Sequence, residues 1–443
     1  MRTPLIRLIA AVAGAAVLAA GCGSGGKPPA QGGGGGAKAE ITLWQQKFTD
    51  QEDAWYKKAV AAFNKAQDKV VLKHVIVPAD TWDQKMKAAQ AAGKAPDVYT
   101  VNYSKVPGFA RTGVIQPLDK LIPADKWAGL QESVAGSVAY KGQKYAYPML
   151  VEPSAVLFWR KDLFTQAGLD PNRPPATWQE LIDYGKKLTT KDVAGVVTAA
   201  NQIDMAWSTW GLQWNAAGHL PITDDWSAPQ ATDPKYKQLL QVYQTLYQEG
   251  IMPKQPLAPY ADANPLGQGK TAMMVCGSWA ASVLIQDYPK LVGTIGAAAL
   301  PSFDGDATKP TATLGGWTMV VDAKSKNPQG AADFVSWLLA GDTTLLVEFF
   351  KNTKFSKYSP RSAVADAIAQ DPAVAENPWA KIIEEQVVKH AKPEPTYDWA
   401  ISLAFGKAIE KALQGKDIDQ ALQAADAEIK DLIAKNNLAG QGS

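Results

Sequence analysis

Cysteine and histidine are scarce in this chain, which has two cysteines and three histidines among its 443 residues. The histidines (His74, His219 and His390) and the cysteines lie far apart, and no stretch has the ligand spacing of a zinc or iron–sulfur site. We therefore expect no metal and no cofactor. No Ser/His/Asp arrangement points to nucleophilic catalysis either, and we expect the chain not to be an enzyme.

An excess of charge of either sign is also missing. The chain has 45 Lys and Arg against 43 Asp and Glu, for a net charge of +2. Two of the bases, Arg2 and Arg7, precede Cys22 without any acid beside them, so the rest of the chain is balanced. Such a balance provides no basic surface for nucleic acid.

Tryptophan is unusually abundant, with 15 residues against 14 tyrosines and 11 phenylalanines. Many indoles indicate either bulky core packing or a surface that stacks on flat, weakly polar ligands. The length exceeds what one ordinary core fills, so two lobes are expected.

The first 22 residues, MRTPLIRLIAAVAGAAVLAAGC, begin with basic residues and continue as an apolar run too short to span a bilayer. The ending Leu-Ala-Ala-Gly-Cys resembles the lipobox of bacterial lipoproteins, which implies a signal peptide over 1–21 and acylation of Cys22. An ordinary secretory signal with a chance cysteine is the alternative. Residues 22–39 are rich in glycine and predict a flexible tether. The folded body is then expected outside the cytoplasm, anchored to the cell membrane, and Cys276 is expected to be an unpaired core residue.

From Glu40 the chain alternates short strands and helices. Strands are expected at 41–44, 70–77 and 96–101, with capping boxes at Thr49 and Thr81 opening the helices between them. This βαβαβ pattern predicts a parallel sheet, which binds ligands at the carboxyl ends of its strands.

A second α/β unit follows. The segment 145–160 is rich in strand-forming residues, and Thr177 is expected to cap a helix. Further strands are expected at MMVCGSW and over 293–300 and 316–321. The C-terminal part is predicted to be mostly helical, over 328–340, 362–370, 376–390 and, in pieces, 397–435.

Five segments together resemble the extracellular solute-binding proteins of bacterial ABC importers, the group that includes maltose-binding protein. They are APDVYTVNYSKVPGFARTGVIQPLD (95–119), the stretch YAYPMLVEPSAVLFWRKDLF…PPATWQELIDYGKKL (145–188), GKTAMMVCGSW (269–279), LGGWTMVVDAKSKNPQGAADFVSWLL (314–339) and KYSPRSAV (357–364).

The resemblance implies a two-lobed α/β fold of the periplasmic-binding-protein type, with discontinuous lobes, hinge strands and a ligand cleft between them. The first lobe is expected from 40–149 and 302–355, and the second from 150–301 and 356–437. The chain would cross between the lobes near 149–153, 299–303 and 350–356.

Trp279 is the first site candidate, because the resemblance implies that it ends a strand at the cleft and stacks on a sugar ring. Gly277 and Ser278 would keep the approach to the indole clear. A place in the core of a lobe is the alternative. Glu152, at the end of an apolar strand, is either a surface residue or an acceptor of sugar hydroxyls, and the resemblance favours the acceptor.

Other candidates follow the ends of the first and third predicted strands: Gln45 and Gln46, whose amides both donate and accept, and Asn102, Tyr103 and Ser104. The spacing of Asp204, Trp207 and Trp210 places several on one helix face, where ligand stacking competes with core packing. Further candidates are Gly316 and Trp317, where two glycines let the backbone approach a ligand closely, and Arg361, for which a structural ion pair is the alternative to donation to ligand oxygens. Tyr397 is a weaker candidate.

The resulting prediction is a monomeric, lipid-anchored binding protein that delivers a carbohydrate, of two or more rings, to the membrane subunits of an ABC permease. The same fold could instead bind a polyamine, ferric iron or another small polar solute. A secreted glycoside hydrolase would need two carboxylates flanking the bond, and Glu152 with Asp204 is the pair that could be read so.

Overall fold

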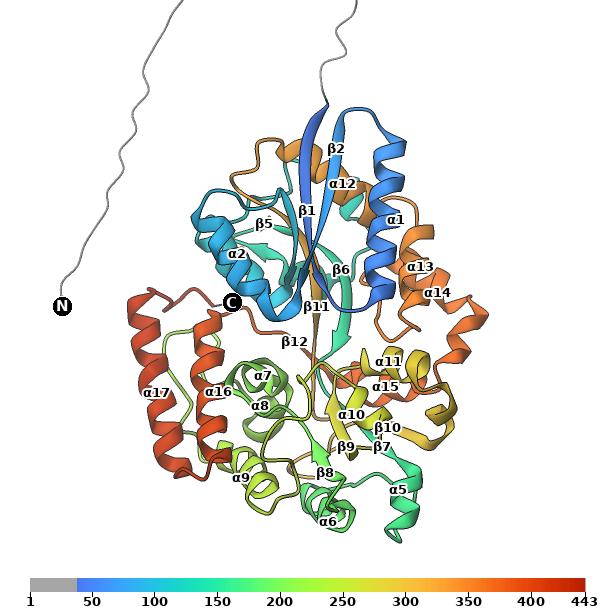
Figure 1. The fold of residues 1–443 in the computed structure, drawn as a ribbon. Coiled ribbons are helices and arrows are strands. Elements are labelled where there is room, and N and C mark those ends of the chain that lie inside the picture. Colours follow the sequence, from blue (N-terminus) through green and yellow to red (C-terminus); the bar gives the residue numbers. More distant parts are fainter. Residues whose placement is uncertain (1–37, 443) are drawn as a thin grey trace, which may run out of the picture. The chain divides into compact units, whose positions relative to one another are not determined.

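The computed structural model describes residues 38–442, which belong to one unit of the chain. The acylation candidate Cys22, the signal peptide and most of the predicted tether lie outside these residues. Two sheets, each covered by helices, organise the described part (Figure 1).

The larger sheet has six strands in the order β12-β11-β3-β1-β2, with β6 also paired to β11. The strand β1 runs parallel to β2 and β3, whereas β11 is antiparallel to β3 and β6. The strand bounds are β1 Ala39–Lys47, β2 Val70–Pro78, β3 Val98–Asn102, β6 Ala146–Pro153, β11 Thr313–Val321 and β12 Lys392–Pro393.

Both faces of this sheet are buried. One face packs against a core that includes Trp55, Phe334 and Phe349, and the other against a core around Trp82 and Tyr99. The helices associated with the sheet are α1 Asp50–Ala66, α2 Trp82–Ala91, α3 Val106–Arg111, α4 Glu132–Ser137, α12 Pro328–Leu339, α13 Thr344–Asn352 and α14 Ser362–Ala369, and a small hairpin joins β4 Ala139–Tyr140 to β5 Gln143–Lys144.

The smaller sheet has four strands in the order β10-β7-β9-β8. The strand β9 pairs antiparallel with β7 and parallel with β8. Its strands are β7 Val156–Arg160, β8 Ala194–Val197, β9 Thr271–Cys276 and β10 Ile295–Ala298. The helices around it are α5 Lys161–Gln166, α6 Trp178–Leu188, α7 Gln202–Ser208, α8 Trp210–Ala217, α9 Tyr236–Gln248, α10 Asn264–Gly267, α11 Ala280–Asp287, α15 Ala380–Gln386, α16 Trp399–Leu413 and α17 Ile418–Lys435.

The chain passes from one sheet to the other at two places, between β6 and β7 and between β10 and β11. The strand β6 ends at Pro153 and β7 begins at Val156, while β10 ends at Ala298 and β11 begins at Thr313. Ser154 ties these passages together, because its N–H donates to the Thr313 carbonyl (3.0 Å) and its hydroxyl lies 3.1 Å from the Thr313 hydroxyl. The result is a two-lobed α/β fold, as expected.

Apolar side chains from the segment after residue 356 pack in two different cores. Val364 of α14 is buried in a core of the larger sheet, and Ile368 and Val374 pack against that core. Trp379 and Ile383 belong to the core of the smaller sheet. Apolar side chains of α14 are therefore buried with the larger sheet.

Two of the three predicted helix caps form. Thr49 and Thr177 accept hydrogen bonds from the N–H groups of Glu52 and Glu180, both at 3.1 Å. The prediction for Thr81 is wrong: its backbone is already helical (φ −105°, ψ 0°), and its side chain makes no cap hydrogen bond. An N-cap needs extended backbone so that its side chain can reach the first free N–H groups.

Candidate ligand-binding site

The carboxyl ends of three strands meet at one edge of the larger sheet. The strands β3 and β6 are both antiparallel to β11, and β1 is parallel to β3, so all three end where β11 begins. The register there pairs Trp317 with Asn102 and Gly315 with Glu152. Predicted candidates from distant parts of the sequence are thereby brought to this edge.

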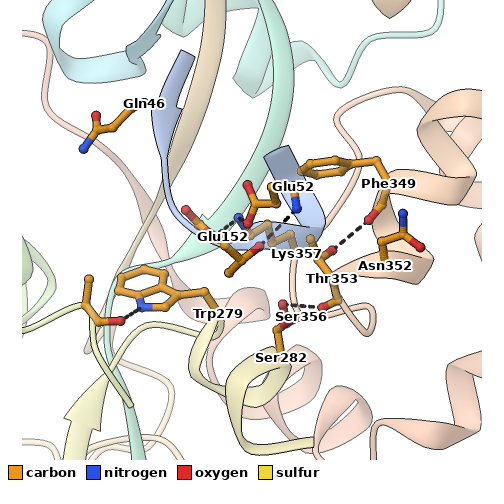
Figure 2. Close-up of polar contacts among 12 residues, drawn as sticks. Gln46, Glu52, Glu152, Trp279, Ser282, Phe349, Asn352, Thr353, Ser356 and Lys357 are labelled. Atoms are coloured by element: carbon orange, nitrogen blue, oxygen red, sulfur yellow. Dashed lines mark hydrogen bonds and ion pairs between the residues drawn. The ribbon is translucent and has the colours of Figure 1, made fainter. Parts of the chain in front are cut away.

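A buried lysine lies between two carboxylates at this edge (Figure 2). The Lys357 ammonium is 2.9 Å from Glu52 Oε1 and 3.9 Å from Glu152 Oε2, and all three side chains are at most 9% exposed. Burial lowers the pKa of Lys357, but the Glu52 and Glu152 carboxylates outweigh it and raise the pKa above its usual value. The lysine is therefore held charged, and it donates its hydrogen bond to Glu52.

Of the two acids, Glu52 accepts a hydrogen bond from Lys357, whereas Glu152 has an oxygen without a hydrogen-bond donor. Its Oε2 is buried and has no hydrogen-bond partner among residues 38–442. Burial raises the pKa of Glu152 to about 6, although nearby Lys357 opposes the shift. A buried acceptor without a donor is costly, so this oxygen is suited to accept a hydrogen bond from a ligand.

Glu394 is a further acid at the same edge, and the sequence analysis missed it. One carboxylate oxygen accepts the Ser104 N–H at 3.2 Å. The side chain also lies so close to the Cα of Gly315 that a Cβ there would clash with it, which explains the glycine. Burial raises the pKa of Glu394 to about 7, and Glu152 contributes to the rise. No local pattern in KPEPTYDW marks this residue, because only the pairing of β12 with β11 brings it here.

Trp279 lies on the side of the smaller sheet. The strand β9 ends at Cys276, and Trp279 precedes α11, half-buried, with its Nε1 donating to the Ala261 carbonyl at 2.9 Å. A Cβ on Gly277 would clash with the Trp279 ring itself. The glycine therefore lets the indole fold back over the chain, a different reason from the clear approach that the sequence predicted.

Two aromatic rings adjoin Trp279. The ring centroids of Trp207 and Tyr260 lie 5.9 Å and 6.4 Å from that of Trp279. Trp207 is half-buried, whereas Tyr260 is buried and donates through its hydroxyl to the Ser154 carbonyl at 2.8 Å. Two of the three rings, those of Trp207 and Trp279, are partly open to solvent, and for this reason the three are called the exposed aromatic cluster. Tyr260 is a member that was not among the predicted residues.

Asp204 lies beside this cluster, one turn before Trp207 on α7. Its carboxylate accepts from the Asn201 amide at 2.7 Å, and burial raises its pKa. A backbone hydrogen bond from Tyr260 partly opposes the rise. The predicted pair of an acid and a tryptophan on one helix face is therefore present, next to Trp279.

Direct contacts join the two sides. Ser278, next to Trp279, donates its N–H to the Pro153 carbonyl (3.2 Å) and its hydroxyl to the Ser356 carbonyl (2.6 Å). Pro153 follows Glu152, and Ser356 precedes Lys357. In Figure 2, Trp279 accordingly lies near the Glu152–Lys357 pair.

An aromatic pair continues the site on the first lobe. The rings of Phe48 and Trp317 have centroids 4.9 Å apart, and the Lys357 ammonium lies 5.6 Å from the Phe48 ring. Phe48 is 39% exposed, which is high for a phenylalanine, and it was not among the predicted residues. Trp317, which was predicted, is half-buried.

Several predicted residues face elsewhere. Trp210 is 1% exposed and donates to Ser402 Oγ at 3.0 Å in the core of the second lobe, where Tyr397 is also buried. Arg361 donates from one guanidinium nitrogen to the carbonyls of Leu339 and Gly341, at the end of α12. These contacts are structural.

The two glutamines after the first predicted strand differ. Gln45 is 1% exposed and contacts Asp53 and His74. The Gln46 side chain is partly exposed, and Figure 2 shows it projecting from the end of β1. Of the two, Gln46 alone has an amide that a ligand could reach.

Tyr103 and Gly316 also serve the first lobe. The Tyr103 ring is 3% exposed within a core of that lobe, and its hydroxyl has no hydrogen-bond partner in the described part of the chain. Gly316 has φ +139°, and a Cβ there would lie 2.6 Å from the Leu150 carbonyl oxygen. Close approach of β6 thus requires this glycine.

Cys276 is buried and unpaired, as predicted, and its thiol donates to the Tyr260 carbonyl at 3.2 Å. Burial raises its pKa far above the usual range. Among residues 38–442, no group of three His, Cys, Asp or Glu side chains could hold a metal ion. No helix within the described range is long and apolar enough to cross a bilayer.

The comparisons with known proteins agree with this architecture. The family model of the bacterial extracellular solute-binding proteins matches residues 48–342. The chain belongs to this family, whose members are substrate-binding proteins rather than enzymes.

Individual relatives are distant. A probable ABC transporter-binding protein of Deinococcus radiodurans is 30% identical over 260 residues, which cover 56% of this chain and 60% of that protein. The diacetylchitobiose binding protein DasA of Streptomyces coelicolor is 25% identical over 417 residues, 91% of this chain and 95% of that protein. The crystal structure of the GacH receptor of Streptomyces glaucescens, described with acarbose, matches with a TM-score of 0.73 and 25% identity over 91% of this chain and 99% of that chain.

Proposed function

We propose that this chain is the substrate-binding subunit of an ABC importer and that it binds a carbohydrate between its two lobes. The observation that carries the proposal is the exposed aromatic cluster of Trp207, Tyr260 and Trp279 beside the unsatisfied carboxylate of Glu152. An indole face packs against the C–H groups of a sugar ring, and a carboxylate accepts hydrogen bonds from its hydroxyls. The names of relatives and structural neighbours, which include a diacetylchitobiose-binding protein and a receptor with acarbose, support the same ligand class.

Two separate aromatic surfaces favour a ligand with two or more rings. The exposed aromatic cluster belongs to the second lobe, and the Phe48–Trp317 pair belongs to the first. Each surface can take one sugar ring when the lobes close over the ligand. Closure driven by binding then presents the shape that the permease subunits recognise.

The lobes that would close are assigned from packing. We propose a first lobe of residues 40–153, 313–374 and the strand β12 (392–393), and a second lobe of 154–312, 375–391 and 394–437. The assignment follows the burial of Val364 with the larger sheet and of Trp379 with the smaller one. We also propose that the protein acts as a monomer.

A non-sugar solute is the alternative ligand for the same fold, and a polyamine is its best example because acids and aromatic rings occur together here. Binding without catalysis is proposed for either ligand. A glycoside hydrolase would use Glu152 and Asp204 as its pair, but the Asp204 carboxylate already accepts a hydrogen bond from the Asn201 amide.

A ligand screen tests the proposal. Unfolding of the full chain in detergent is followed by tryptophan fluorescence with mono-, di- and oligosaccharides, and with spermidine and ferric citrate as controls. Ligand that binds the native state raises the unfolding temperature by mass action. A saturable rise with a saccharide is expected. A response to a control alone would contradict the carbohydrate assignment.

We further propose that Cys22 carries a lipid that anchors the protein outside the cytoplasmic membrane. The apolar run before Cys22 and the small residues around it support this proposal. Cys22→Ala is expected to move the protein from the membrane fraction to the soluble extracytoplasmic fraction, whereas Cys276→Ala is expected to leave it with the membrane. Membrane association of Cys22→Ala would rule out the lipid anchor.

A further inference from the structure

The proposed sugar site carries more negative charge than is required to accept hydrogen bonds from a neutral sugar. At the sheet edge, Glu52 and Glu152 share a single ammonium, that of Lys357, and Glu394 lies against Gly315, the register partner of Glu152. Lys105 is the next base, and it is paired with Asp83 at 3.0 Å. Glu394 itself has no ion-pair partner within residues 38–442 and is held only by Ser104.

Glu152 and Glu394 are neighbours. Gly315 is the register partner of Glu152, and the Glu394 side chain lies directly against the Cα of Gly315. Each acid makes the other harder to ionise. The Glu152 side chain is more than nine-tenths buried, and its Oε2 accepts no hydrogen bond from the described residues. The pair therefore has an unfilled place for a donor group.

A neutral ligand would worsen this imbalance. When a sugar enters and displaces water, the carboxylates lose the solvent that screens them, and hydroxyl groups bring no compensating charge. A cationic group on the ligand would offset both acids and donate hydrogen bonds to them. The indoles of Trp207 and Trp279 also attract cations through their ring faces.

We infer that the ligand is a basic carbohydrate, one that carries a free amino group, and that this ammonium is bound between Glu152 and Glu394. The inference rests on the proposed carbohydrate function and narrows its substrate class. Asp204, beside the exposed aromatic cluster and without an ion-pair partner among the described residues, adds to the negative charge facing the ligand.

The test uses sugars that differ only at one position. The full chain in detergent is titrated by calorimetry with chitosan disaccharide, diacetylchitobiose and cellobiose, which carry an amine, an acetamide and a hydroxyl at the same carbon. Glucosamine, galactosamine and mannosamine are compared with glucose, galactose and mannose in the same way, and spermidine is included. The expected result is tighter binding of the amine in at least one matched set, by roughly tenfold or more.

Variants of the protein test whether the acid pair Glu152 and Glu394 causes the preference for the amino sugar. Glu394→Gln keeps the shape and removes the charge, and it is expected to reduce the preference for the amine while affecting the neutral sugars less. Glu385→Gln makes the same change on an exposed helix, where the side chain is 63% exposed, and should preserve the preference. A general structural defect would instead weaken all sugars alike.

Each other outcome overturns the inference. Equal or tighter binding of the hydroxyl or acetamide sugars contradicts a cationic ligand and leaves the carbohydrate function standing. An amine preference unchanged by Glu394→Gln contradicts the assigned position. Binding of spermidine without any saccharide, or no binding by the whole panel, contradicts the proposed function together with the inference.

Discussion

Two aromatic clusters in the second lobe begin three residues apart in sequence and differ in almost every physical respect. Trp207 ends up half-buried beside Trp279 and Tyr260, whereas Trp210 is 1% exposed, with its ring 6.0 Å from that of Trp399. The first is the exposed aromatic cluster, and the second, of Trp210 and Trp399, is the buried aromatic cluster. The indole of Trp210 donates to Ser402, which joins α8 to α16.

The difference arises from a break in the helix. The segment that looks like one amphipathic helix is two, α7 and α8, with Thr209 as the boundary between them. Side chains three residues apart share a face only along one continuous helix. Across the break, Trp207 faces the site and Trp210 faces the core.

The largest expected effect is on the buried aromatic cluster. Trp210→Ala removes a buried ring and leaves a cavity and an unpaired Ser402, which should lower the free energy of unfolding by about 3 to 5 kcal/mol. Urea unfolding followed by circular dichroism measures this loss. Affinity for the ligand should survive in Trp210→Phe, and a large loss of affinity there would erase the distinction between the clusters.

The next effect is on the exposed aromatic cluster. Trp279→Ala should weaken saccharide binding roughly tenfold to a hundredfold, or about 1.4 to 2.7 kcal/mol, because a stacking surface is lost. Stability should fall less than in Trp210→Ala, since the Trp279 ring is only half-buried. Fluorescence titration gives the affinity. Unchanged affinity would remove Trp279 from the site.

The edge of the larger sheet differs from both clusters in carrying the acid Glu394, whose raised pKa makes stability depend on pH. Burial raises the folded-state pKa of Glu394 to about 7, so the native protein binds more protons than the unfolded chain between its usual pKa near 4.5 and 7. Stability is therefore lost as the pH rises through this range. Glu394→Gln should remove on the order of 1 to 2 kcal/mol of that loss. Thermal unfolding of both proteins at about pH 4 and about pH 8, on either side of this range, measures this loss, and parallel pH curves would contradict the raised pKa of Glu394.

The smallest effect tests how the Trp279 indole is held. In Gly277→Ala the new methyl group displaces the ring, and affinity should fall a few-fold, by about 1 kcal/mol, although every site residue is still present. Gly293→Ala is the control, because nothing lies within 4 Å of a Cβ at that glycine. Equal affinities in the two variants would show that the ring position is not critical.

Most of the fold was predictable from local sequence. Alternating strands and helices, the caps at Thr49 and Thr177 and the buried face of α1 follow from short-range patterns. The cap at Thr81 fails for a local reason, because Thr81 is the last residue of a short 3-10 helix. The burial of Val364 in a core of the larger sheet, in contrast, depends on contacts between distant parts of the chain.

The residues of the candidate site that lie at the ends of strands were predictable from the sequence. Glu152 and Asn102 meet because β6 and β3, which both run antiparallel to β11, end at one edge of the sheet, and Trp317 of β11 is the register partner of Asn102 there. Glu394, Lys357 and Tyr260 could not be found in this way. They come from loops and from a two-residue strand, and only long-range pairing brings them beside Glu152.

A crystal structure of the full chain with the saccharide that most raises its unfolding temperature tests the central claim most directly. The account predicts a sugar ring stacked on the indole of Trp279, with ligand donor groups within hydrogen-bond distance of Glu152 and Glu394. A ligand bound elsewhere on the protein, with the Glu152 Oε2 still lacking a donor, would contradict it.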